Sequence, residues 1–180
     1  MVEPDTDYIN RFVLDSYHPA FESDALETSH PISVEANHPD EIMENFDSIA
    51  YSKGSSVIRM MANFLGIDTF NRGITNYLNT YAYGNAEQDD LWDQLTQVAV
   101  EDGSLEDGVT VKTIMDTWTL QMGFPVVTVS RSGNTITCDQ ERFLIAEEEE
   151  DKKVRNKGAK KSQMICAQFN LVSDRDKEAI

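Results

Sequence analysis

The sequence predicts a mainly α-helical region followed by a β-hairpin, and two changes of pattern support this fold class. Apolar residues recur at helical spacing through residues 1–124. From Pro125 onward they alternate with polar residues, as in a strand with one buried face. The chain has 180 residues, of which 40% are hydrophobic, and this suits one packed domain plus the start of another.

Four amphipathic helices are predicted in the second half of the helical region. Gly66, Gly103 and Gly123 are expected to end the first, third and fourth of them, because glycine readily adopts the left-handed conformation that stops a helix. The apolar faces consist of Val57, Ile58, Met61, Phe64 and Leu65; Phe70, Ile74, Tyr77, Leu78 and Tyr81; Leu91, Trp92, Leu95, Val98 and Ala99; and Ile114, Met115, Trp118 and Met122.

A β-hairpin is predicted after the last helix. The segment 125–131 reads PVVTVSR, which alternates apolar and polar residues and is rich in valine. Ser-Gly-Asn at 132–134 is a turn signal, and residues 135–145 are expected to form the returning strand. A hairpin that follows a run of helices predicts a domain boundary near Gly123.

The net charge of the chain indicates which class of binding partner is excluded. The formal net charge is −17, and this excludes a nucleic-acid surface because phosphate binding needs clustered Lys and Arg. Residues 146–180 form a charged tail, with an acidic block followed by a basic stretch at 152–161. Such blocks are usually solvated, although residues 164–172 could form one more strand.

No segment of the sequence indicates a cellular compartment. No apolar run approaches the roughly 20 residues that a membrane span needs. The acidic first five residues have no following apolar stretch and are not expected to be a signal peptide. Cys138 and Cys166 allow either one disulfide or two unrelated thiols, and their spacing does not decide between them.

Four short segments stand out by their order along the chain. Alone, Tyr51 in Y-S-K-G would be read as a buried side chain at a helix start. The four segments are DALETSHPI at 24–32, FDSIAYSKG at 46–54, YGNAEQDDLW at 83–92 and MDTWTLQMGFP at 115–125. Together they resemble the gluzincin zinc aminopeptidases of peptidase family M1, in particular the animal aminopeptidase N type, over about residues 5–145. An unrelated helical bundle would need all four to be coincidence.

The resemblance implies a domain organisation. Residues 1–124 look like the C-terminal helical part of the thermolysin-like catalytic domain. Residues 125–145 look like the first hairpin of the β-sandwich domain that follows it in this family. Residues 146–180 do not resemble the family's next strands and form a divergent tail.

The resemblance also implies a chemistry, the zinc-dependent removal of single residues from peptide N-termini. In the family, zinc is held by His-Glu-x-x-His and a later Glu, and the Glu of the motif is the general base. Tyr51 matches the tyrosine whose hydroxyl stabilises the oxyanion, a role that suits a neutral phenol donor. Phe46 matches a position that lines the pocket for the substrate's first side chain.

The metal ligands and the general base are not found in this sequence. It has no His-Glu-x-x-His, and His18, His30 and His38 each precede a proline, which predicts loop or turn positions that make poor zinc ligands. Glu44, in a Met-Glu-Asn that lacks the family's preceding Gly, is expected to be an ordinary exposed helix residue. We expect a fragment from downstream of the zinc-binding motif that binds no zinc and is inactive alone.

Two interpretations of the chain follow from the resemblance. In the first, it is part of an aminopeptidase that acts on peptides and needs the missing N-terminal half of the catalytic domain. In the second, it is a non-catalytic truncated isoform that acts as a binding or interaction module. Zinc ligands in a longer transcript, upstream of Met1, would favour the first. Relatives of this type are often membrane-anchored ectodomains, extracellular or lumenal, whereas other family members are cytosolic.

Overall fold

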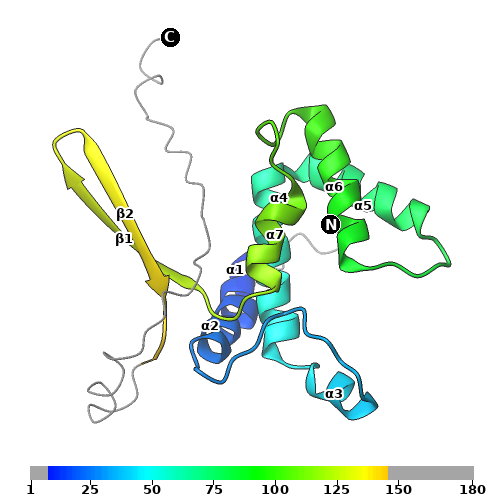
Figure 1. Cartoon of the computed structure of the whole chain (residues 1–180), viewed down its shortest axis with the longest axis horizontal. Coiled ribbons are helices and arrows are strands. Elements are labelled where there is room, and N and C mark those ends of the chain that lie inside the picture. Colours follow the sequence, from blue (N-terminus) through cyan, green and yellow to red (C-terminus); the bar gives the residue numbers. More distant parts are fainter. Residues whose placement is uncertain (1–7, 146–180) are drawn as a thin grey trace.

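The computed structural model describes residues 8–145, a set of helices followed by a hairpin (Figure 1). The helices are α1 (Tyr8–Phe12), the π-helical η1 (Val13–Tyr17), α2 (His18–Asp24), α3 (Pro39–Glu44), the π-helical η2 (Ile49–Lys53), α4 (Gly54–Leu65), α5 (Ile67–Thr80), α6 (Gln88–Asp102) and α7 (Val111–Thr119). The strands β1 (Pro125–Ser132) and β2 (Thr135–Arg142) pair antiparallel. The predicted fold class, mainly α followed by the start of a β region, is confirmed.

Two helical runs contain a π-turn, in which the backbone widens by about one residue. The first run joins α1, η1 and α2, the second joins η2 and α4, and the two π-turns contact each other. Pro19 follows the first π-turn; a proline lacks the N–H of a regular helix and crowds the preceding turn. His18 is helical, with φ −61° and ψ −52°, so its prediction as a loop or turn residue is wrong.

The hydrophobic core lies between α4, α6 and α7. Its buried residues are Val57, Met61, Leu65, Trp92, Leu95, Ala99, Val111 and Met115. The predicted faces are therefore correct in outline, although three of their residues, Ile58, Leu78 and Met122, are 52%, 61% and 39% exposed. Helix α5 packs closely on α6 at Gly73, where an added Cβ would lie 3.2 Å from the Cα of Leu95.

Glycines end the helices where the sequence predicts for α4 and α6. Gly66 has φ 84° and Gly103 has φ 66°, both outside the range that other residues adopt readily. Helix α7 ends at Thr119, earlier than expected, and Gly123 lies with φ 83° in the segment that leads into β1. None of the helices between residues 8 and 145 combines the length and apolar content that a membrane crossing demands.

The hairpin extends away from the helices and touches them only at its base (Figure 1). Ser132 pairs with Thr135, so the predicted turn consists of Gly133 and Asn134 alone, and the returning strand ends at Arg142 rather than at Ile145. At the base, the backbone N–H of Ile145 donates to the carbonyl of Ala25 at 3.1 Å. Cys138 is exposed and forms no disulfide within the part of the chain that the structure describes. Cys166 and the predicted tail, with its additional strand, lie outside the described residues.

Candidate functional site

The two residues predicted for the site lie side by side on an exposed face. Tyr51 is 62% exposed and Phe46 is 60% exposed, so the alternative of a buried, packing Tyr51 is wrong. Their ring centroids are 6.3 Å apart, with 34° between the ring planes. They line a hollow of about 300 Å³ together with Ala36, Ile42, Asn45 and Ala50. The hollow offers one phenol hydroxyl and otherwise mostly apolar walls.

Tyr51 is placed by the π-turn η2, and Asp47 fixes the start of that turn. The Oδ1 atom of Asp47 accepts hydrogen bonds from the backbone N–H groups of Ile49 at 2.9 Å and Ala50 at 3.0 Å. The backbone carbonyl of Asp47 accepts from the N–H of Tyr51 at 3.1 Å. One residue therefore satisfies three free N–H groups at the helix start.

His30 contacts Asp47 from a neighbouring loop. Its Nε2 lies 2.8 Å from Oδ2 of Asp47, and its Nδ1 lies 2.7 Å from the carbonyl oxygen of Pro31. Both ring nitrogens face acceptors, and only the imidazolium form donates from both. Burial lowers the pKa of His30, but the hydrogen bonds to Pro31 and Asp47 and the charges of Asp47 and Asp24 outweigh it and raise the pKa.

The pKa of Asp47 is shifted in the opposite direction from that of His30. Burial raises the pKa of its carboxyl group, but the hydrogen bonds from the Ala50 N–H and from His30, with the charge of His30, lower it overall. The pair therefore favours a charged histidine beside a charged aspartate.

A buried ion pair lies at the other end of η2. The Nζ of Lys53 is 2.9 Å from Oδ2 of Asp24, and the side chains are only 6% and 2% exposed. Lys53 Nζ also donates to the carbonyls of Gln121 at 3.1 Å and Gly123 at 3.3 Å. The Oδ1 of Asp24 accepts from the Gly123 N–H at 2.7 Å and from the Ser29 hydroxyl at 2.6 Å. Both buried charges are thus surrounded by hydrogen-bond partners.

This network joins three of the four sequence segments that carry the family resemblance, and the sequence reasoning missed it. Asp24 comes from the first segment, Lys53 from the second and Gly123 from the fourth. The spacing of Lys53 from the apolar residues that follow it could have indicated a buried lysine. Lys53 precedes Val57 and Met61 at intervals of four, so a cation occupies the apolar face of this helix.

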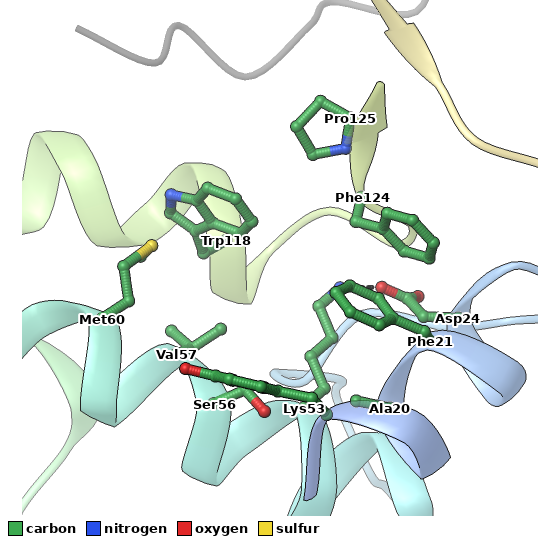
Figure 2. Close-up of a pocket in the computed structure, with 11 residues that line it drawn as sticks. Ala20, Phe21, Asp24, Lys53, Ser56, Val57, Met60, Trp118, Phe124 and Pro125 are labelled. Atoms are coloured by element: carbon green, nitrogen blue, oxygen red, sulfur yellow. Dashed lines mark ion pairs between the residues drawn. The ribbon is translucent and has the colours of Figure 1, made fainter. Parts of the chain in front are cut away.

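A largely apolar cavity of about 450 Å³ lies beside the ion pair. Figure 2 shows Met60 and Trp118 on one side of the cavity and Phe21 and Phe124 on the other, with the Asp24–Lys53 pair marked between α2 and the start of α4. The ring centroids of Phe21 and Phe124 are 4.7 Å apart. The cavity lies where the hairpin joins the helices, and the sequence did not predict it.

The residues of the described part do not fit a zinc site. Structural and catalytic zinc sites need three or four converging His, Cys, Asp or Glu ligands, and no such group of three or more occurs between residues 8 and 145. His30 is engaged with Asp47, and His18 is exposed on α2. His38 is extended and caps α3, which confirms its prediction as a turn residue. Glu44 is an exposed residue of α3, as expected.

Comparison with known proteins gives the family to which this chain belongs. A family model described as "Peptidase family M1 domain" matches residues 1–118. The chain belongs to peptidase family M1, and the predicted resemblance to the aminopeptidase N type is confirmed.

The curated relatives are much longer than this chain. Aminopeptidase N of Mus musculus is 45% identical over 146 residues, which are 79% of this chain and 15% of that protein. Aminopeptidase N of Bos taurus is 52% identical over 126 residues, 68% of this chain and 13% of that protein. The alanine/arginine aminopeptidase of Saccharomyces cerevisiae is 41% identical over 152 residues, 83% of this chain and 17% of that protein. The chain thus spans less than a fifth of these relatives.

Proposed function

We propose that this chain is part of a zinc-dependent aminopeptidase that removes single residues from peptide N-termini, and that it supplies one wall of the active site. The observation that carries this proposal is the pairing of Phe46 and Tyr51 over one exposed hollow. The names of the aminopeptidase relatives support the reaction class. Because residues 8–145 do not fit a zinc site, the metal ligands and the general base would come from another part of the protein.

In this proposal Tyr51 is a catalytic residue. Its hydroxyl group donates a hydrogen bond to the oxygen of the scissile carbonyl as negative charge develops there. Its exposure on η2 leaves the hydroxyl free to face a substrate that binds from outside the helical region. Phe46, with the apolar side chains of Ala36 and Ile42, would contact the first side chain of the peptide.

The substitution Tyr51→Phe tests this role in the full-length protein that carries the segment. We expect kcat to fall by ~10²–10³, because one oxyanion donor is lost, while KM changes little. Steady-state hydrolysis of an aminoacyl chromogenic substrate measures both constants. Tyr83→Phe is the matched control, since Tyr83 lies fully exposed in a loop and should have no effect. Unchanged turnover in Tyr51→Phe would rule out the proposed role.

The purified 180-residue chain should bind no stoichiometric zinc and should not hydrolyse the substrate. Metal analysis and a turnover assay on the same sample test this expectation. Bound zinc with turnover that a chelator abolishes would overturn it. If the longer gene product also lacks a His-Glu-x-x-His motif, a non-catalytic interaction module replaces the aminopeptidase proposal.

We further propose that the hairpin begins a second domain. Most residues of β1 and β2 are exposed, on both faces of the two-stranded sheet. An isolated hairpin is marginally stable in water, and a hydrophobic face normally needs further strands or a packed partner. This exposure supports a domain boundary between residues 124 and 125. The helical part of the catalytic domain would end there, and a β-sandwich domain would begin.

A further inference from the structure

We propose that His30 is a positioning residue for Tyr51, which it holds through Asp47. The inference rests on the proposed role of Tyr51 in catalysis. A hydrogen bond from His30 to Asp47 connects the loop after α2 with the first turn of η2. His30 belongs to no potential metal-binding group among the described residues.

The connection is continuous from the imidazole to the tyrosine backbone. His30 Nε2 bonds to one carboxylate oxygen of Asp47 at 2.8 Å. The other oxygen accepts from the N–H groups of Ile49 and Ala50, and the backbone carbonyl accepts from Tyr51. The orientation of the Asp47 carboxylate therefore sets the direction in which the first turn of η2 runs. His30 fixes that orientation from outside the helix.

The same loop also anchors the far end of η2. Ser29, the neighbour of His30, donates its hydroxyl to Asp24, which pairs with Lys53. Residues 29 and 30 thus hold both ends of the five-residue turn Ile49–Lys53 that carries Tyr51 in its middle.

This arrangement suits an exposed catalytic group. Tyr51 is 62% exposed, so side-chain packing restricts it little and its position depends on its backbone. A catalytic hydroxyl displaced by about 1 Å can cost ~10² in rate. A fixed turn beneath an exposed side chain provides the required placement without burying the hydroxyl.

The test compares variants in the zinc-loaded full-length protein that carries this segment. We expect His30→Ala to lower kcat about tenfold and to leave KM nearly unchanged, because the Tyr51 hydroxyl acts in the transition state. His30→Gln keeps an N–H donor that can reach Asp47 and should recover most of the activity. His18→Gln is the matched control, since His18 is exposed on α2, and it should behave as the unaltered enzyme.

A double-mutant cycle separates positioning from general stabilisation. If His30 acts through Tyr51, adding His30→Ala to Tyr51→Phe should lower kcat no further. An equal loss in both backgrounds, or full activity of His30→Ala, would overturn the inference. Should His30→Ala not fold, Asp47→Asn replaces it in the cycle, because the asparagine keeps an acceptor for the backbone N–H groups but loses the charge beside His30. Full activity of Tyr51→Phe alone would instead overturn the proposed function, and the inference with it.

Discussion

The molecule contains two charged networks that differ mainly in their burial. In the first, Lys53 pairs with Asp24 beneath η2, and the lysine side chain is 6% exposed. In the second, Arg72 of α5 pairs with Glu101 and Asp102 at the end of α6, and the arginine side chain is 52% exposed. Both cations have more than one partner, so partner number does not distinguish them.

The difference shows what each network can contribute. Removing one member of the buried pair leaves a buried charge without its counter-ion, whereas water solvates what remains of the exposed pair. The buried network should therefore fix how α2, η2 and the segment before β1 fit together. The α5–α6 region should depend on packing instead, and the predictions below test that contrast.

The largest effect is expected from Lys53→Met. It leaves the carboxylate of Asp24 buried and unpaired, and the free energy of unfolding should fall by about 3–5 kcal/mol. Equilibrium urea unfolding, followed by circular dichroism, measures the change. In the double variant Asp24→Asn, Lys53→Met, both charges are removed, and the loss should be clearly smaller than the sum of the two single losses. Additive losses would show that the pair is not coupled.

Gly73→Ala should give the second largest effect. The new Cβ would lie 2.5 Å from Cδ2 and 3.2 Å from Cα of the fully buried Leu95. Overpacking costs about 1–3 kcal/mol, and alanine has a helix propensity about 1 kcal/mol better than that of glycine, so we expect a net loss of up to about 2 kcal/mol. Gly54→Ala is the matched control in a helix with open space, and it should be neutral or stabilising. Equal urea midpoints for both variants would contradict the packing argument.

The half-buried His30–Asp47 pair should give an intermediate effect that depends on pH. The pKa of His30 is raised, so its contribution is complete below about pH 6.5 and is lost as the pH rises through the folded-state pKa. The pKa of Asp47 is lowered, so its contribution is present above about pH 4 and is lost as the pH falls through the folded-state pKa. The urea midpoint should fall most in His30→Gln between about pH 4 and 6.5, and less at pH 9. A pH-independent difference would disprove the ionic contribution.

The smallest effect is expected from Arg72→Gln. Its guanidinium group and both carboxylates reach water, so the urea midpoint should move less than in Lys53→Met, Gly73→Ala or His30→Gln. Whatever shift is seen at low salt should shrink in about 1 M NaCl, because salt screens exposed charges. A shift as large as that of Lys53→Met would mean that burial does not explain the contrast between the two networks.

The elements that sequence patterns predict well are those defined by near neighbours. Val57, Met61 and Leu65 recur every four residues and are buried on one helix, and a turn at the predicted Gly133 joins two antiparallel strands. The Phe46 and Tyr51 pair was found through motif order, and the structure places both residues on one hollow. These features need only local spacing or a short recognisable segment.

The features that were missed depend on contacts between distant parts of the chain. The pairing of Asp24 with Lys53 cannot be derived from helical spacing, because the two residues belong to separate helical runs. The π-turn before Pro19 was missed for a different, local reason. A proline usually marks the end of helical geometry for its predecessor, and the widened turn η1 keeps His18 helical here.

The buried ion pair has a consequence for the order in which the chain folds. Gly123, whose N–H binds Asp24, follows it by 99 residues, and its carbonyl follows Lys53 by 70. Closing such long loops costs entropy that nearer contacts do not, so these bonds form late. At a synthesis rate of ~5–20 residues per second, Lys53 leaves the ribosome about 4–14 s before Gly123. Throughout that interval the lysine lacks the Gln121 and Gly123 carbonyls that later accept its hydrogen bonds, and water takes their place.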